Sequence, residues 1–177
     1  AGPNNFSGYV MYYNKILFDE AGLPYPHEGG TWEEYLHLSP ALTMDTDGDG
    51  KIDQFGTVFE NWLPGWIPWV WSNGGDVLSS DGKTASGFLN SSQTEESLKF
   101  LIELRTKYNV APHNNELSAT GGTSSLFFTN RIGMSPSGHW WLMTLRKYIA
   151  SGDLRIGVVP LPTPDGGQHV TVMYEAG

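Results

Sequence analysis

Residues 8–14, GYVMYYN, form a short run of aromatic and β-branched side chains that is typical of a β-strand. Residues 15–21 follow at once with a short helical pattern, which Gly22 and Pro24 end. A strand that leads directly into a helix indicates an α/β fold. The chain continues this alternation, with helices expected over 31–40, 93–108, 123–130 and 139–149 and strands over 55–59, 132–135, 154–159 and 169–174. Because the late strands are close together in the sequence, we expect an α/β chain with a mixed sheet flanked by helices.

Two of the expected helices begin with a capping box, in which a hydroxyl and a carboxylate three residues later bind each other's backbone amides. Thr31 and Glu34 form the first, and Ser92 and Glu95 the second. The apolar side chains that follow Glu95 recur at helical spacing, which makes 93–108 the clearest helix of the chain.

The composition argues against several classes of partner. The 177 residues include no cysteine, which excludes disulfides, thiolate metal sites and a cysteine nucleophile. Ten Lys and Arg against nineteen Asp and Glu give a net charge of −9, so nucleic acid and anionic membranes are not expected as partners. No apolar stretch approaches the roughly 20 residues that a membrane-spanning helix needs.

Residues 45–53, DTDGDGKID, resemble a calcium loop, in which alternate side chains converge on one hard cation and a glycine allows the sharp turn. Position 12 of such a loop would be Gly56, where a bidentate Glu belongs. An Asp- and Gly-rich turn that merely resembles the loop is the alternative. The expected ligands of a structural Ca²⁺ are Asp45, Asp47, Asp49, the Lys51 carbonyl and Asp53.

Tryptophan is concentrated in residues 62–71, at Trp62, Trp66, Trp69 and Trp71. Pro64, Gly65 and Pro68 interrupt this stretch, so a loop is expected, and loops often carry binding residues. An exposed indole stacks on the apolar face of a sugar ring while nearby polar groups such as Glu60 and Asn61 bind its hydroxyls. Burial in the core is the commoner fate of tryptophan, and peptides or quaternary ammonium ligands use similar surfaces.

Residues 137–140, SGHW, open the expected helix at 139–149. Gly138 allows close backbone approach where free helix amides hydrogen-bond a ligand oxygen. His139 has no serine or cysteine nucleophile beside it in the sequence, so we assign no catalytic residue. Ser137, His139 and Trp140 are therefore candidates for ligand binding.

Six motifs in order resemble the extracellular solute-binding proteins of bacterial ABC sugar importers, the maltose-binding-protein-like group. They are 12–24 (YYNKILFDEAGLP) with 31–34 (TWEE), 72–78 (SNGGDVL), the helix 93–108, 127–134 (FFTNRIGM), 137–140 (SGHW) and 157–162 (GVVPLP). The resemblance implies a type II periplasmic-binding-protein fold, with two α/β lobes that close on a ligand. It implies that residues 1–177 are a single lobe, most of the C-terminal one, without the N-terminal lobe and the final helices.

The resemblance also implies the site and the partners. Trp140 is the strongest candidate for a sugar-stacking ring, and Trp62, Trp66, Trp69 and Glu175 map more loosely onto cleft positions. The expected protein is a monomeric, non-enzymatic binding protein outside the cytoplasm, extracellular or periplasmic and tethered to the membrane when intact. It would need no cofactor and would deliver a sugar or oligosaccharide to an ABC permease. A carbohydrate-binding module is one alternative, and a glycoside hydrolase that uses Glu60 and Glu175 is another.

Overall fold

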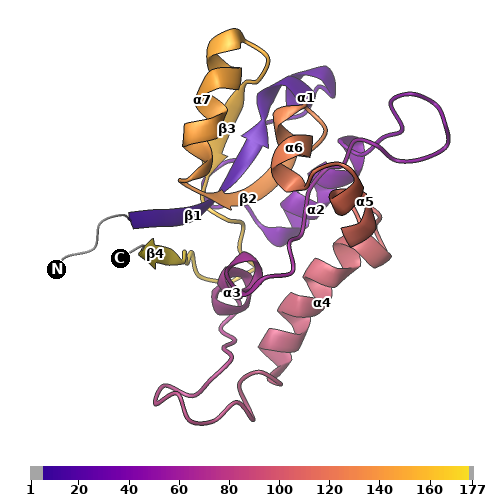
Figure 1. Ribbon diagram of the computed structural model, residues 1–177. Coiled ribbons are helices and arrows are strands. Elements are labelled where there is room, and N and C mark those ends of the chain that lie inside the picture. Colours follow the sequence, from indigo (N-terminus) through magenta and orange to yellow (C-terminus); the bar gives the residue numbers. More distant parts are fainter. Residues whose placement is uncertain (1–5, 176–177) are drawn as a thin grey trace.

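The structure, a computed structural model, describes residues 6–175 and has the α/β architecture that the sequence predicts (Figure 1). Its elements in chain order are β1 (Phe6–Asn14), α1 (Lys15–Glu20), α2 (Trp32–Ala41), α3 (Leu63–Ser72), α4 (Ser92–Thr106), α5 (Asn114–Ala119), α6 (Thr123–Phe128), β2 (Met134–Gly138), α7 (Trp141–Ser151), β3 (Ile156–Val159) and β4 (Met173–Glu175).

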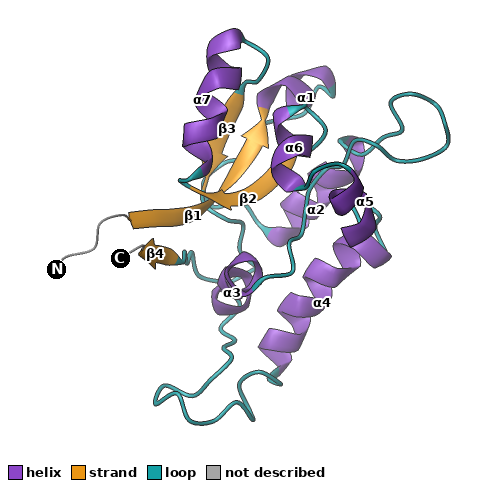
Figure 2. Cartoon of the chain, viewed as in Figure 1, coloured by secondary structure: helices purple, strands orange, loops and turns teal. Residues whose placement is uncertain are grey.

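Strand β1 is the centre of the sheet, because all three other strands pair with it (Figure 2). β2 and β3 flank its second half, and β4 pairs with its first three residues. All three ladders are antiparallel. The expected mixed sheet is therefore wrong for the described residues, where parallel pairing is limited to isolated bridges, Phe55 with Ile132 and Thr31 with Thr163.

Alternate residues of β1 divide the core into two parts, as the two-residue period of a strand requires. Tyr9, Met11 and Tyr13 belong to a cluster that includes side chains of α2, α3 and α4. Tyr12 belongs to a second cluster, built with α6 and α7, against which Val10 also packs. Both faces of the strand are thus covered, which explains why residues 8–14 are apolar almost throughout.

Two segments differ from their expected structure. Residues 55–59 form no strand beyond the single bridge at Phe55, although most of their side chains are buried. Residues 62–71 are almost entirely helical, in α3, and not a loop. Pro64 lies in the first turn of α3, where a backbone N–H would have no hydrogen-bond partner within the helix, so a proline there costs no hydrogen bond. Pro68 lies inside the helix, and burial of one helix face stabilises α3 despite it.

The helix caps follow the sequence closely. Thr31 Oγ1 accepts from the Glu34 amide at 3.1 Å and Glu34 Oε2 accepts from the Thr31 amide at 2.9 Å, which confirms the capping box. Helix α4, for which the second capping box was expected, starts one residue earlier than predicted. Its cap is Ser91 and not Ser92, and the Ser91 hydroxyl accepts a 3.3 Å hydrogen bond from the Thr94 amide. Helix α5 was not expected.

Candidate functional site

Trp62 and Trp140 meet at the surface, although they come from distant parts of the sequence. Their ring centroids lie 6.4 Å apart with an interplanar angle of 69°. Trp62 immediately precedes α3 as its N-cap residue, and Trp140 has the same place before α7. The two side chains are 39% and 41% exposed, so parts of both rings remain open to solvent.

Tyr9 lies beneath this pair and completes a three-ring cluster. Its ring centroid is 6.5 Å from that of Trp62 and 6.3 Å from that of Trp140. It is only 2% exposed, and its hydroxyl donates to the Pro136 carbonyl at 3.3 Å. Tyr9 therefore fixes the two tryptophans to the central strand. Sequence reasoning placed Tyr9 in a strand but missed its part in the site, because the antiparallel register that sets it opposite Gly138 is a tertiary feature.

Each tryptophan packs closely on a glycine. A Cβ at Gly138 would lie 1.9 Å from Cζ3 of Trp140, and a Cβ at Gly65 would lie 2.8 Å from Cδ1 of Trp62. A side chain at either position would push the indole out of its place. Gly138 was expected to allow a close approach of a ligand, whereas here it allows the close approach of Trp140.

A shallow hollow of about 400 Å³ opens beside Trp62. Its polar groups are those of Glu60, Asn61, Asn114 and Ser118, and Leu117 adds an apolar surface. An indole next to a carboxylate and amides offers stacking together with hydrogen-bond donors and acceptors, which is the combination that a sugar uses.

Ser137 and His139 of the 137–140 motif differ in their exposure. Ser137 is in β2 and is 5% exposed. His139 is exposed, and its backbone amide donates to Ser7 Oγ at 2.8 Å, which ties the turn before α7 to β1.

The remaining tryptophans of 62–71 separate according to the face of α3 on which they lie. Trp69 is 2% exposed and packs in the core against Trp32 and Tyr35, so it presents no ring face to a ligand. Trp66 is partly buried. Trp71 is 37% exposed and its indole nitrogen donates to Asp76 Oδ1 at 3.0 Å. The four tryptophans therefore do not share one environment: Trp69 is in the core, Trp66 is partly buried, and Trp62 and Trp71 are exposed.

Glu175 lies in β4, where its backbone pairs with Phe6, and its side chain is outside the described part of the structure.

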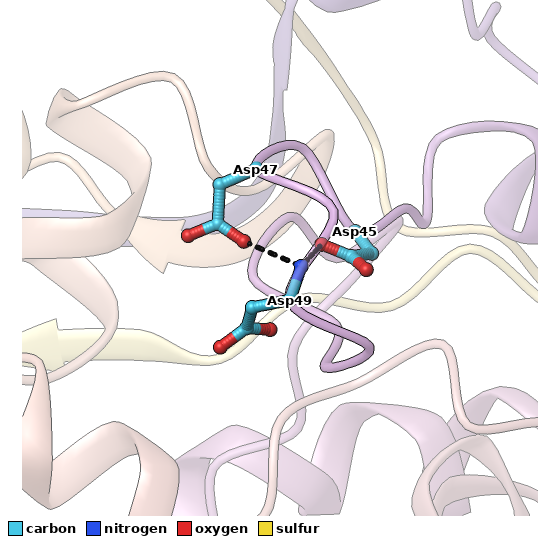
Figure 3. A group of neighbouring side chains, drawn as sticks. All are labelled: Asp45, Asp47 and Asp49. Atoms are coloured by element: carbon cyan, nitrogen blue, oxygen red, sulfur yellow. Dashed lines mark hydrogen bonds between the residues drawn. The ribbon is translucent and has the colours of Figure 1, made fainter.

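The aspartate loop brings three carboxylates together (Figure 3). One oxygen each of Asp45, Asp47 and Asp49 lie within 4.8 Å of one another, and the three residues are exposed or half-exposed. Asp45 accepts the amides of Gly50 and Gly48, each at 2.7 Å, and these bonds hold the pKa of its carboxyl below its usual value. The triad could hold a metal ion, with oxygen ligands of the kind that hard cations prefer.

Asp53 and position 12 of the expected calcium loop do not join this triad. Asp53 is turned to Thr46, whose hydroxyl donates to both its carboxylate oxygens, and to Arg131, at 3.9 Å. The Lys51 ammonium lies 3.8 Å from Asp49 Oδ2. Gly56 is buried, and a Cβ there would lie 2.0 Å from the Ser39 carbonyl oxygen, so position 12 belongs to the core.

The sequence model of the bacterial extracellular solute-binding proteins matches residues 2–177, nearly the whole chain. The chain belongs to this family. The resemblance seen in the sequence is thus confirmed, and so is the expectation of a binding protein and not an enzyme.

Solved structures of solute-binding proteins share the fold. An ABC substrate-binding protein from Listeria monocytogenes, in complex with cycloalternan, has 25% identity and a TM-score of 0.84 over 98% of this chain and 41% of its own. A solute-binding protein from Thermotoga lettingae, bound to alpha-D-tagatose, has 22% identity and a TM-score of 0.78 over 97% and 42%. A maltodextrin-binding domain from Bdellovibrio bacteriovorus, bound to maltotriose, has 22% identity and a TM-score of 0.75 over 98% and 42%.

The chain spans about two-fifths of the length of these solute-binding proteins. No helix within residues 6–175 is long and apolar enough to cross a membrane.

Proposed function

We propose that the chain is the C-terminal lobe of a sugar-binding protein that serves a bacterial ABC importer. The observation that carries this is the pair of part-exposed indoles, Trp62 and Trp140, held edge to face over Tyr9 and next to Glu60 and Asn61. The relatives named above, which bind cycloalternan, maltotriose and tagatose, support a saccharide as the ligand.

In the intact protein a second lobe would cover the aromatic cluster and exclude water from the sugar. The intact protein would be a monomer, located outside the cytoplasm and tethered to the membrane. It would pass its ligand to a permease. The expected sugar contacts of this lobe are Trp140 and Trp62, with Ser137, His139, Trp66 and Glu175 as further candidates.

The test is to titrate the chain with saccharides and to monitor binding through the indole N–H signals in two-dimensional NMR. Millimolar neutral sugars should shift the signals of Trp62 and Trp140 and leave that of the buried Trp69 in place. Trp140→Ala should weaken binding by about tenfold, the worth of one aromatic contact. Trp71→Ala is the matched control, because Trp71 is similarly exposed but turned to Asp76. Equal losses from the two variants would refute the assignment.

The affinity of the isolated lobe for sugar gives a second test of the proposal. Because only one wall of the cleft is present, we expect the isolated lobe to bind sugar with a Kd near or above about 1 mM, whereas a closed two-lobe site would bind far more tightly. Nanomolar binding by the lobe alone would contradict this reasoning.

We also propose that the aspartate loop holds a structural Ca²⁺, since three carboxylate oxygens converge there. The missing position 12 ligand predicts affinity in the weak range of about 10⁻⁴–10⁻³ M. Calorimetric titration with Ca²⁺ should give heat with the natural chain and none with Asp47→Asn. Asp165→Asn, at an exposed turn near Gly166, is the control. A natural chain with no heat and no shift of melting temperature would exclude the metal.

A further inference from the structure

A second cavity, of about 440 Å³, lies between helices α3 and α4 near the start of α5. Its lining includes Trp66 from α3 and Leu98, Ile102 and Arg105 from α4. Asn61 lines this cavity and also the hollow beside Trp62. Asn61 is therefore a wall that the two spaces share.

Arg105 gives this cavity an unusual polar group. The side chain is 8% exposed, and its Nε–H is buried without a hydrogen-bond partner among the described residues. Nη2 donates to the Phe59 carbonyl, and the guanidinium carbon lies 4.9 Å from the centre of the Phe59 ring. Among the side chains that the structure describes, no carboxylate comes within 4 Å of the guanidinium nitrogens, so this charge is buried without an ion pair to any of them. The unpaired Nε–H carries a desolvation cost, and Arg105 is among the residues that line the cavity.

The surrounding charges decide between an anionic and a neutral ligand. Burial lowers the pKa of Arg105, while the carboxylates of Glu60 and Glu116 oppose that shift and so lie within electrostatic reach. Two negative charges around one positive charge disfavour a phosphate or a carboxylate at this place. A neutral ligand with hydroxyls accepts from the guanidinium and donates to a carboxylate or amide oxygen.

The apolar walls complete the argument. The Trp66 indole and the side chains of Leu98 and Ile102 border the cavity, and Ile102 is 51% exposed. A sugar unit has an apolar face for such surfaces and hydroxyls for Arg105 and Asn61.

We propose that the cavity lined by Trp66, Ile102 and Arg105 is a second saccharide subsite, which shares Asn61 with the hollow beside Trp62, and that the ligand is a neutral oligosaccharide long enough to reach both. This inference rests on the proposed sugar-binding function. The first subsite stacks one unit on Trp62 and Trp140, and the second holds a later unit of the same ligand.

The experiment titrates the isotope-labelled chain with a panel of neutral α- and β-linked hexose oligomers of increasing length. Monosaccharides should shift the indole signals of Trp62 and Trp140 alone, whereas longer oligomers should also shift those of Trp66 and of the Arg105 Nε–H. Oligomers that shift Trp62 and Trp140 at every length but never Trp66 would overturn the second subsite and leave the proposed function standing. A panel that shifts none of these signals would overturn both.

A pair of variants tests the subsite without altering Arg105. Ile102→Trp fills the mouth of the cavity from an exposed position, so the fold should tolerate it. Ile149→Trp, on an exposed position of α7 that lines neither space, is the matched control. The blocked variant should lose about tenfold in affinity for long oligomers and keep its affinity for monosaccharides, while the control should match the natural chain. Equal affinities of the two variants for long oligomers would overturn the proposal.

Discussion

Replacing Gly138 by alanine should displace Trp140 and open the aromatic cluster. The added Cβ would lie 1.9 Å from Cζ3 of the indole, against an ordinary contact distance of at least 3.4 Å. The ring must therefore retreat by about 1.5 Å. Because Trp140 is 41% exposed, the ring has room to swing toward solvent, and β1 and β2 keep their pairing.

The energetic cost follows from the contacts that the ring leaves. Trp140 touches the rings of Tyr9 and Trp62, with centroids 6.3 Å and 6.4 Å away. Each aromatic pair is worth about 0.5–1.5 kcal/mol. Loss of both contacts should lower the free energy of unfolding by about 1–3 kcal/mol, in the range of other overpacked sites.

Gly8→Ala is the matched control, since Gly8 lies on the neighbouring strand and the nearest atom to its added Cβ is 4.0 Å away. Its unfolding free energy should stay within about 0.5 kcal/mol of the natural chain. Urea unfolding measures both variants, and the indole NMR signals of Trp62 and Trp140 report the displacement. If Gly138→Ala leaves both signals unchanged, or costs no more than Gly8→Ala, the close packing of Trp140 on Gly138 is refuted.

Three further results are expected. Trp69→Ala should cost about 3–5 kcal/mol in urea unfolding, because the ring is 2% exposed in the core, whereas Trp71→Ala should cost less than about 1 kcal/mol. Gly56→Ala should destabilise by about 3 kcal/mol, since its Cβ would meet rigid backbone at 2.0 Å, and a loss below about 1 kcal/mol in urea unfolding would contradict this. The hydrogen bond from Tyr25 lowers the pKa of Asp19. The ionised Asp19 carboxylate therefore contributes to stability above pH ~4, and this contribution is lost as the pH falls through the lowered pKa. Asp19→Asn should accordingly flatten the acid side of the melting-temperature profile, and an unaltered profile would count against the contact.

The sequence predicts local features well where one short segment contains all the necessary information. The capping box at Thr31 needs only Glu34, three residues on, and both bonds are present. The strand at 8–14 is marked by apolar side chains on both faces, because two core clusters cover it. The resemblance to the solute-binding proteins mapped both Trp140 and, more loosely, Trp62 onto cleft positions, and in the structure their rings lie 6.4 Å apart.

The failures concern features that depend on distant partners. Residues 55–59 have a strand-like composition, yet the segment stays irregular with buried side chains because it pairs at one bridge alone. Residues 62–71 contain two prolines and a glycine, yet burial of Trp69 and Val70 stabilises a helix against these propensities. Tyr9 joins the site through a strand register that no local pattern contains.

The central place of β1 has a consequence during synthesis. Among the described strands β1 is made first, and its earliest strand partner, β2, begins only at Met134. At roughly 5–20 residues per second, the strand stays unpaired for on the order of ten seconds. An apolar strand with free edges is prone to intermolecular pairing. Shielding of residues 8–14 until β2 has been made would therefore protect the nascent chain from aggregation.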